Sequence, residues 1–165
     1  MKTHSGFTLV ELMIVLALVA ILATIGVPSF TSFVINNRLT AQANELVSAL
    51  NLARSEAIKR NRRVTVCRSN NGAGCGGTWN DGWIVFVDDG AAGLVDGTDE
   101  LLRAWSGPGN TSSLTSTVNS VQFQGLGLTT LSTFTLTSSQ CTGTNKRLVQ
   151  VATSGRVSTA KASCP

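Results

Sequence analysis

The sequence predicts an α+β protein, in which a long N-terminal helix precedes a domain of short antiparallel strands. Two patterns lead to this fold class: apolar residues recur at three- and four-residue spacing as far as Ile58, and short β-branched runs alternate with glycine-rich turns beyond Asn61. Only 13% of the 165 residues are charged and tyrosine is absent, which is typical of a secreted β-rich domain rather than a cytosolic enzyme. The roughly 130 residues beyond a membrane-length N-terminal segment are enough for one small domain.

The first element is an apolar run from Phe7 to Val27 that contains one charge, Glu11. As a helix rising ~1.5 Å per residue, this run reaches about 30 Å, the thickness of a bilayer's hydrocarbon core. A carboxylate at the centre of a membrane costs roughly 2.5 to 3.5 kcal/mol, and such residues usually have a functional partner. The sequence therefore predicts a membrane-spanning helix in which the Glu11 carboxylate has a functional partner and does more than anchor the chain.

Two simpler interpretations of this run remain open. It could be a secretory signal peptide, with Lys2 as its basic region and cleavage near residues 24–26. It could also be a plain signal anchor in which the Glu11 carboxylate remains hydrated at the membrane interface. Neither interpretation explains why Gly6 directly precedes Phe7.

Helical periodicity continues past Pro28, so we expect one long helix with a kink or a loosened turn at that proline. The helix is expected to end near Arg60 to Asn61, because β-branched residues follow. Its second half is amphipathic, and its apolar face carries Leu39, Ala43, Leu46, Val47, Leu50, Ala53, Ala57 and Ile58.

The rest of the chain alternates short apolar runs with turn residues, which predicts strands. The expected strands are 63–68, 83–87, 101–105, 118–123, 133–137, 146–152 and 156–159. The last two should form a hairpin whose turn presents Gly155 and Arg156. Trp79, Trp83 and Trp105 are expected in the core rather than on a ligand platform.

Four cysteines form an even set in a chain that crosses a membrane, which predicts two disulfides in an oxidising compartment. Three pairings are compatible with the sequence. We favour Cys67 with Cys75 and Cys141 with Cys164, because each pair closes a local loop, worth ~2.5 to 3.5 kcal/mol in the chain-entropy model. A zinc site is disfavoured, since no pair has the spacing of a zinc motif and no histidine lies nearby.

Charge is distributed in blocks along the chain. Residues 38–68 contain seven basic and two acidic side chains, residues 79–100 contain six acidic and no basic ones, and from residue 101 onward five basic side chains occur without an acid. These blocks could attract polyanions or make subunits associate head to tail, although each single charge is most simply a solvated surface group.

The sequence contains no set of residues that suggests an enzyme or a cofactor. Its only histidine is His4, so serine or cysteine catalysis would lack its usual base, and phosphate-binding glycine motifs are absent. Asp89 and Glu100 have the span of a calcium-binding EF-hand loop, but Ala91 and Gly93 stand where that loop needs oxygen ligands. An acidic surface turn is therefore favoured over calcium, and no cofactor or metal is expected.

The N-terminal segment resembles that of type IV pilins and type II secretion pseudopilins. The resemblance lies in Gly6 followed by Phe7-Thr8-Leu9-Val10-Glu11 and an apolar run that includes Pro28. It implies that residues 1–6 are a leader, that prepilin peptidase cleaves after Gly6 and methylates Phe7, and that residues 7–35 form a transmembrane and assembly helix. It also implies that the carboxylate of Glu11 meets the N-terminal amine of a neighbouring subunit, which would offset the desolvation of both charges.

A second resemblance, over residues 46–61, is to the helix end of the GspH/FimT/FimU group of minor pilins, and the segments 78–90, 100–103 and 155–157 with Cys164 also resemble that group. It implies a pilin-like fold: an amphipathic helix of the globular domain at 36–62, packed on a β-rich periplasmic domain of two small antiparallel sheets at 63–165. The implied protein is a single-pass inner-membrane minor pilin that joins a pilus or pseudopilus, near its tip, through contacts with other pilins and with membrane lipid. It is not an enzyme.

The alternative function is that of a DNA receptor in natural transformation, because some FimT-like minor pilins bind DNA. Those receptors carry a glycine-arginine-any-arginine motif, and residues 155–158 of this chain keep only the first arginine, Arg156. The candidate DNA-binding residues are Lys146, Arg147, Arg156 and Lys161. If all four met phosphates, the affinity for duplex DNA would fall with salt at a log-log slope of about −3.6.

Overall fold

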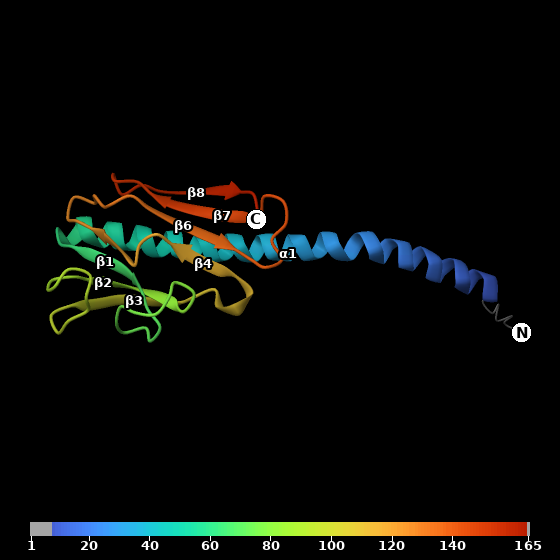
Figure 1. Ribbon diagram of the computed structural model, residues 1–165, viewed down its shortest axis with the longest axis horizontal. Coiled ribbons are helices and arrows are strands. Elements are labelled where there is room, and N and C mark those ends of the chain that lie inside the picture. Colours follow the sequence, from blue (N-terminus) through green and yellow to red (C-terminus); the bar gives the residue numbers. More distant parts are fainter. Residues whose placement is uncertain (1–7, 165) are drawn as a thin grey trace, which may run out of the picture. The chain divides into compact units, whose positions relative to one another are not determined.

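The computed structural model describes residues 8–164, except for the side chains of Ile25 and Pro28. Within this range the chain forms one long helix, one short 3-10 helix and eight strands (Figure 1). The elements are α1 Leu9–Arg60, β1 Val64–Arg68, β2 Gly82–Val87, β3 Glu100–Ser106, η1 Gly109–Thr111, β4 Ser113–Ser116, β5 Ser120–Phe123, β6 Ser132–Thr137, β7 Lys146–Val151 and β8 Val157–Ala162. Helix α1 passes position 28 without a break and ends where the sequence predicts. Gly6 and Phe7 lie outside the described residues.

By its internal contacts the chain divides into two units, Met1–Val34 and Ile35–Pro165. The second unit contains the remainder of α1, all eight strands and both disulfides. We call it the globular unit.

The globular unit has two antiparallel sheets of four strands, with the orders β3-β2-β1-β5 and β4-β6-β7-β8. The strand sequences account for this arrangement. Strand β6, Ser132–Thr137, alternates buried and partly exposed residues, as expected for a sheet with one face in the core. Strand β2, Gly82–Val87, is buried on both faces and is apolar after its first residue. The predicted fold class, a long helix with two small antiparallel sheets, is confirmed.

The core of the globular unit forms between the apolar face of α1 and both sheets. Alanines at positions 49, 53 and 57 of α1 are fully buried, and such small side chains let a sheet lie close to the helix. The same cluster contains Val66, Val85 and Phe123 from the first sheet and Phe134, Leu136 and Val149 from the second. The helix-facing sides of the two sheets therefore share one core.

Two of the three tryptophans lie inside this core, as predicted, and the third, Trp105, packs against its margin. Trp79 packs edge-on against Phe134, with ring centroids 4.9 Å apart, and its indole N–H donates to the carbonyl of Val118 at 2.8 Å. Trp83 is fully buried. Trp105 is only half-buried, because it sits on the edge strand β3, where the guanidinium of Arg103 covers its ring at 4.7 Å.

The strand predictions differ from the structure mainly in the second sheet. Strand β4 was not predicted, because its sequence, Ser-Leu-Thr-Ser, contains a single apolar residue, Leu114; its pairing with β6 places it in the sheet. Strand β8 starts at Val157 rather than Arg156 and extends to Ala162 rather than Thr159. The reason is that it pairs with the whole length of β7. Strand β5 starts at Ser120 rather than Val118.

The two disulfides join Cys67 to Cys75 and Cys141 to Cys164, which are the pairs that the local-loop argument favours. The first closes the loop after β1, and the Cα atoms of its cysteines are 5.6 Å apart. The second ties the segment after β6 to the residues that follow β8, across 5.7 Å. Both sheets are thus cross-linked close to the ends of strands.

Arg147 on β7 is a structural residue of the globular unit. Its side chain points toward α1 and the residue is only 5% exposed. One terminal nitrogen, Nη1, donates to the carbonyl oxygens of Thr144 at 3.3 Å and Asn145 at 3.0 Å, and the other, Nη2, donates to Asn36 Oδ1 and to Thr40 Oγ1. These bonds join β7 to the helix at the edge of the core.

We predict that Arg147→Ala lowers the unfolding free energy of a soluble 35–165 fragment by about 1.5 to 3 kcal/mol, the range for hydrogen bonds to a charged group. Urea unfolding monitored by tryptophan fluorescence measures this loss. The control is Lys161→Ala, because Lys161 is the exposed cross-strand neighbour of Arg147 and should shift stability by less than about 0.5 kcal/mol. Equal effects of the two substitutions would contradict the structural role.

Candidate functional site

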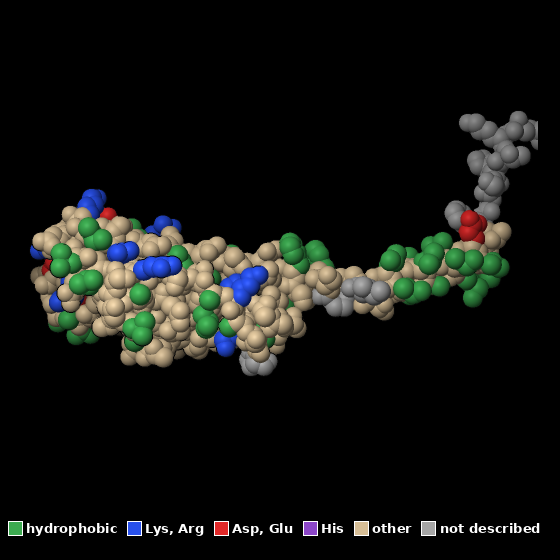
Figure 2. Space-filling model, turned by 90° about the horizontal axis from the view of Figure 1, so that it is seen from above, with side chains coloured by type: hydrophobic (Ala, Val, Ile, Leu, Met, Phe, Trp, Pro, Cys, Tyr) green, Lys and Arg blue, Asp and Glu red, His purple; other side chains and the backbone are tan. Residues whose placement is uncertain are grey.

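The first half of α1 exposes apolar side chains on all sides. These are Leu9, Val10, Leu12, Met13, Ile14, Val15, Leu16, Leu18, Val19, Ile21, Leu22, Val27, Phe30, Phe33 and Val34. Figure 2 shows hydrophobic side chains over the visible face of this segment. Among the described residues, α1 is the one helix that is long and apolar enough to cross a membrane, by length and composition. A surface of this kind is stable when lipid or other apolar helices cover it.

Two hydroxyl groups of this segment, those of Thr24 and Thr31, are satisfied within the helix. The hydroxyl of Thr24 donates to the carbonyl of Ile21 at 2.7 Å, and the hydroxyl of Thr31 donates to the carbonyl of Val27 at 3.0 Å. In lipid, a polar group without a partner costs several kcal/mol. These bonds therefore suit a helix that lies in a membrane or in a bundle of apolar helices.

Glu11 lies in the first turn of α1, where a negative charge is favourable to the helix dipole. Its backbone N–H donates to Thr8 Oγ1 at 3.3 Å, so Thr8 caps the helix. Sequence reasoning did not identify this cap, although the spacing Thr-x-x-Glu is that of a capping box and predicts a helix start. The Glu11 carboxylate makes no ion pair with any residue of the described range 8–164.

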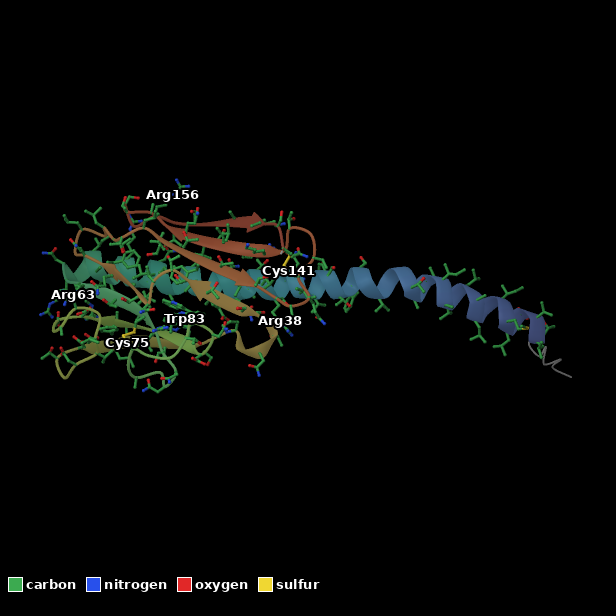
Figure 3. The ribbon with its side chains drawn as sticks, viewed as in Figure 1. Arg38, Arg63, Cys75, Trp83, Cys141 and Arg156 are labelled. Carbon is green, nitrogen blue, oxygen red and sulfur yellow. A yellow bond between two sulfur atoms is a disulfide. The ribbon has the colours of Figure 1, made fainter. Side chains whose placement is uncertain are left out.

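The four candidate DNA-binding residues do not lie together. Arg156 is exposed at the turn between β7 and β8 (Figure 3), whereas Lys146 and Lys161 lie at the opposite end of the same hairpin. Six-residue strands separate the two ends by about 17 Å, from ~3.3 Å per residue. Arg147 is buried and its donors already have protein acceptors. We therefore remove Arg147 from the candidates, and a patch of four cations does not form.

Ion pairs attach the acidic segment after β2 to the residues that directly follow α1. Arg62 pairs with Asp89 at 2.8 Å, and Arg63, labelled in Figure 3, pairs with Asp88 at 2.7 Å. The side chain of Asp88 is fully buried, and it also accepts from Thr65 Oγ1 at 2.6 Å. The basic block around the helix end and the acidic block that follows β2 therefore neutralise each other.

The carboxylates of this acidic loop are occupied by the loop's own backbone. Asp99 accepts from the N–H groups of Asp89 and Asp96, and Asp96 accepts from that of Ala91, at 2.8 to 3.0 Å. Three or more metal-ligating side chains do not converge anywhere in residues 8–164. The geometry is that of an acidic surface turn, the arrangement that the sequence favours over an EF-hand.

Three carboxylates, the exposed Asp81 and Asp96 and the partly buried Glu56, have pKa values below their ordinary range. A hydrogen bond from Arg60 lowers the pKa of Glu56, backbone and hydroxyl bonds from Thr78 lower that of Asp81, and the hydroxyl of Thr98 lowers that of Asp96. Such groups stabilise the folded state while they are ionised, and they lose this contribution when the pH falls through the folded-state pKa.

We predict that the stability of the 35–165 fragment is constant near neutral pH and falls as the pH drops below about 4.5, the ordinary pKa of a glutamate. The loss should be modest, because Asp81 and Asp96 are solvated and the Lys59 and Arg60 partners of Glu56 are themselves partly exposed. Urea midpoints between pH 7 and pH 2.5 measure it. Glu56→Gln should reduce the slope, and stability that rose on acidification would contradict the assignment.

The elements described so far define a class of protein: a helix that is apolar on all sides in its first half and packs on two small antiparallel sheets in its second half. The model of the family "Type II transport protein GspH" matches residues 42–155, and that of the prokaryotic N-terminal methylation motif matches residues 1–27. The chain belongs to the GspH family, whose members are pilin-like.

Two relatives and one solved structure agree with this membership. A fimbrial protein of Pseudomonas aeruginosa is 41% identical over 64 residues, which are 39% of this chain and 41% of that protein. The pilin-like protein PilA1 of Thermus thermophilus is 33% identical over 110 residues, 66% of this chain and 64% of that protein. This chain thus spans about two fifths of the first relative and just under two thirds of the second. The minor pilin FimU of Pseudomonas aeruginosa shares the fold, with a TM-score of 0.60 and 23% identity over 78% of this chain and 92% of FimU.

Proposed function

We propose that this protein is a minor pilin or pseudopilin that is processed, held in the inner membrane and assembled into a type IV pilus or a type II secretion pseudopilus, at or near its tip. The observation that carries the proposal is the first half of α1, which is apolar on all sides except for Glu11. Prepilin peptidase would cleave after Gly6 and methylate Phe7, the step that the N-terminal methylation motif supports. Neighbouring major and minor pilins would then cover the apolar helix.

Glu11 is the residue that we assign to subunit assembly. Cleavage would place a cationic amine at Phe7, one residue before the Thr8 cap. A neighbouring subunit's amine would meet the Glu11 carboxylate as both leave water, so that each charge offsets the desolvation of the other. Within residues 8–164 the carboxylate has no ion-pair partner of its own, which supports a partner on another subunit.

A shallow apolar groove on the same helix, with Ala23 and Gly26 among its lining residues, supports close packing of helices. It is lined by Val19, Leu22, Ala23, Gly26, Val27, Phe30 and Thr31. A Cβ added at Gly26 would meet nothing within 4 Å, so the backbone there is open to a neighbouring helix. Small residues let helix backbones approach closely in apolar surroundings.

The globular unit suits the periplasmic side of the membrane. Its two disulfides form and persist in oxidising compartments such as the periplasm. We therefore propose a single-pass topology with the globular unit in the periplasm and later, after assembly, in the filament.

We predict that Glu11→Val leaves membrane insertion and cleavage after Gly6 intact and strongly reduces entry into filaments, because only the pairing with a neighbouring amine is lost. Immunoblots of membrane and sheared-filament fractions measure the two steps separately. The matched control is Glu45→Val, since Glu45 is an exposed glutamate of the same helix in the globular unit. Wild-type amounts of the Glu11→Val protein in filaments would show that the assembly role is wrong.

A DNA-receptor function is the second candidate, supported by the exposed Arg156 beside Gly155. The guanidinium of Arg54 on α1 lies under the same turn and donates to the carbonyl of Ser154 at 3.1 Å. Arg54 and Arg156 are thus two cations that one DNA backbone could meet, with a log-log salt slope of about −1.8 rather than −3.6.

Gel-shift titration of the soluble fragment at two salt concentrations tests this second candidate. A shift that weakens with the smaller slope and drops about tenfold in Arg156→Gln would support DNA binding. Lys146→Gln, at the far end of the hairpin, is the matched control and should leave binding unchanged. The absence of a shift at low salt would exclude the DNA-receptor function and leave assembly.

A further inference from the structure

Strand β8, Val157–Ala162, is the outermost strand of the second sheet and is exposed on both faces. It pairs only with β7 in the order β4-β6-β7-β8 (Figure 1). Residues 158–161 are exposed, and the two end residues are half-buried. Its side chains are small or polar except for Val157, and Lys161 carries the one charge of the strand. The strand therefore contributes little to the core of the globular unit.

The free edge of β8 presents the backbone groups of three residues. The N–H of Ala152 donates to the carbonyl of Arg156, so residues 152 and 156 form a hydrogen-bonded pair. Hydrogen-bonded and non-hydrogen-bonded pairs alternate along an antiparallel ladder. By this alternation residues 158, 160 and 162 bond to β7, whereas Val157, Thr159 and Lys161 direct their N–H and C=O groups away from it.

The other sheet edges carry features that discourage strand pairing. Edge strand β3 carries Glu100 and Arg103 and pairs with a register shift at Val85/Phe86, and edge strands β4 and β5 have four residues each. Strand β8 has six paired residues, no register shift and no proline. Among the described edges it is the one that offers a regular template to another strand.

Both ends of β8 are held in place. At one end the Cys141–Cys164 disulfide and a bond from the Cys164 N–H to the Gly143 carbonyl restrain the chain. At the other end Gly155 adopts φ +74°, and a Cβ there would collide with the carbonyl of Gly127 and lie 2.9 Å from Arg54 Nε. Strand β8 buries little surface, and these restraints beyond its two ends help to keep it paired with β7.

The surroundings of β8 are basic and lack a counter-charge. No acidic residue occurs after Glu100 in the sequence, and no ion pair of the described range involves Lys146, Arg156 or Lys161. Figure 2 looks onto the side that carries β8 and shows several Lys and Arg side chains on the globular unit. Elsewhere in this unit, by contrast, Glu100, Asp89 and Asp88 pair with Arg60, Arg62 and Arg63 near the end of α1.

We propose that β8 is a docking edge for an extended, acidic segment of another polypeptide, which adds to the second sheet as a fifth strand. Outward N–H and C=O groups of residues 157, 159 and 161 supply the backbone bonds, and Lys161 selects a carboxylate on the incoming strand. A second copy of β8 is less suitable, because it would bring more basic residues to a surface without acids. This proposal concerns the globular unit alone and does not depend on assembly through α1.

The test uses the full chain in detergent and a labelled, end-blocked peptide of about eight residues that alternates glutamate and threonine. Fluorescence anisotropy should show saturable binding that weakens with salt, and a peptide with glutamine in place of glutamate should bind more weakly. Hydrogen exchange should slow at the amides of Val157, Thr159 and Lys161 when the glutamate peptide is bound.

Two variants separate edge pairing from simple charge attraction. Thr159→Pro removes an N–H that points away from β7, so the β7 ladder stays intact while peptide binding falls at least about tenfold. Thr159→Ala, the matched control, keeps the N–H and should bind as the wild type does. Lys161→Gln should weaken binding about threefold and reduce its salt dependence, which tests the proposal even if the proline variant does not fold.

Four results would overturn the proposal. The first is no binding of the glutamate peptide by the wild-type chain, and the second is equal binding by a folded Thr159→Pro chain. The third is binding of a DNA oligonucleotide that displaces the peptide and depends on Arg156 but not on the β8 backbone. The fourth is a dimer that Thr159→Pro abolishes while the peptide fails to bind, which would identify a second copy as the occupant.

Discussion

Burial of the second half of α1 against both sheets is the constraint on which the rest of the globular unit depends. Each sheet has only four strands, and a small sheet needs an apolar partner for its inner face. Helix α1 supplies that partner to both sheets at once, through buried alanines and leucines. The disulfides restrain the chain near strand ends, and Arg147 joins β7 to polar residues of α1 at the edge of the core. Because one helix serves both sheets, its sequence is under a stronger constraint than either sheet's outer face.

The distribution of charge follows from this packing. The basic residues just after α1 and the acidic loop after β2 reach each other because β1 and β2 are neighbouring strands, so Arg63 and Asp88 meet at the same end of the sheet. Burial of the Asp88 carboxylate costs free energy unless its charge is paired, and Arg63 and Thr65 supply its partners. The C-terminal basic residues have no such neighbour, since the second sheet contains no acid. These cations are therefore hydrated or pair with another molecule.

Most of the fold was predictable because its signals are local. Helix periodicity, the β-branched runs and the short cysteine loops each depend on neighbours in sequence, and these predictions agree with the structure. Strand β4 and the full length of β8 were not predictable, since Ser, Thr and Ala residues become strands there only through pairing with β6 and β7. The arrangement of the basic candidates was not predictable for the same reason: alternation along β7 turns Arg147 inward, and the sequence does not show that Arg156 and Lys161 lie at opposite ends of the hairpin. Thr8 could have been identified from the capping-box spacing.

The two surfaces that we assign to association use different physics. The first half of α1 offers apolar area in which the hydroxyls of Thr24 and Thr31 are bonded within the helix, and such a surface selects partners by shape and by the single charge of Glu11. Strand β8 offers the reverse: almost no apolar area, but a row of directional backbone groups beside a cation. Hydrogen bonds exposed to water contribute little net free energy each, so an edge of three residues binds weakly unless another contact raises the local concentration of its partner. The proposed assembly through α1 would place other subunits beside this edge and raise their local concentration, whereas a free acidic peptide meets the edge alone and binds it more weakly.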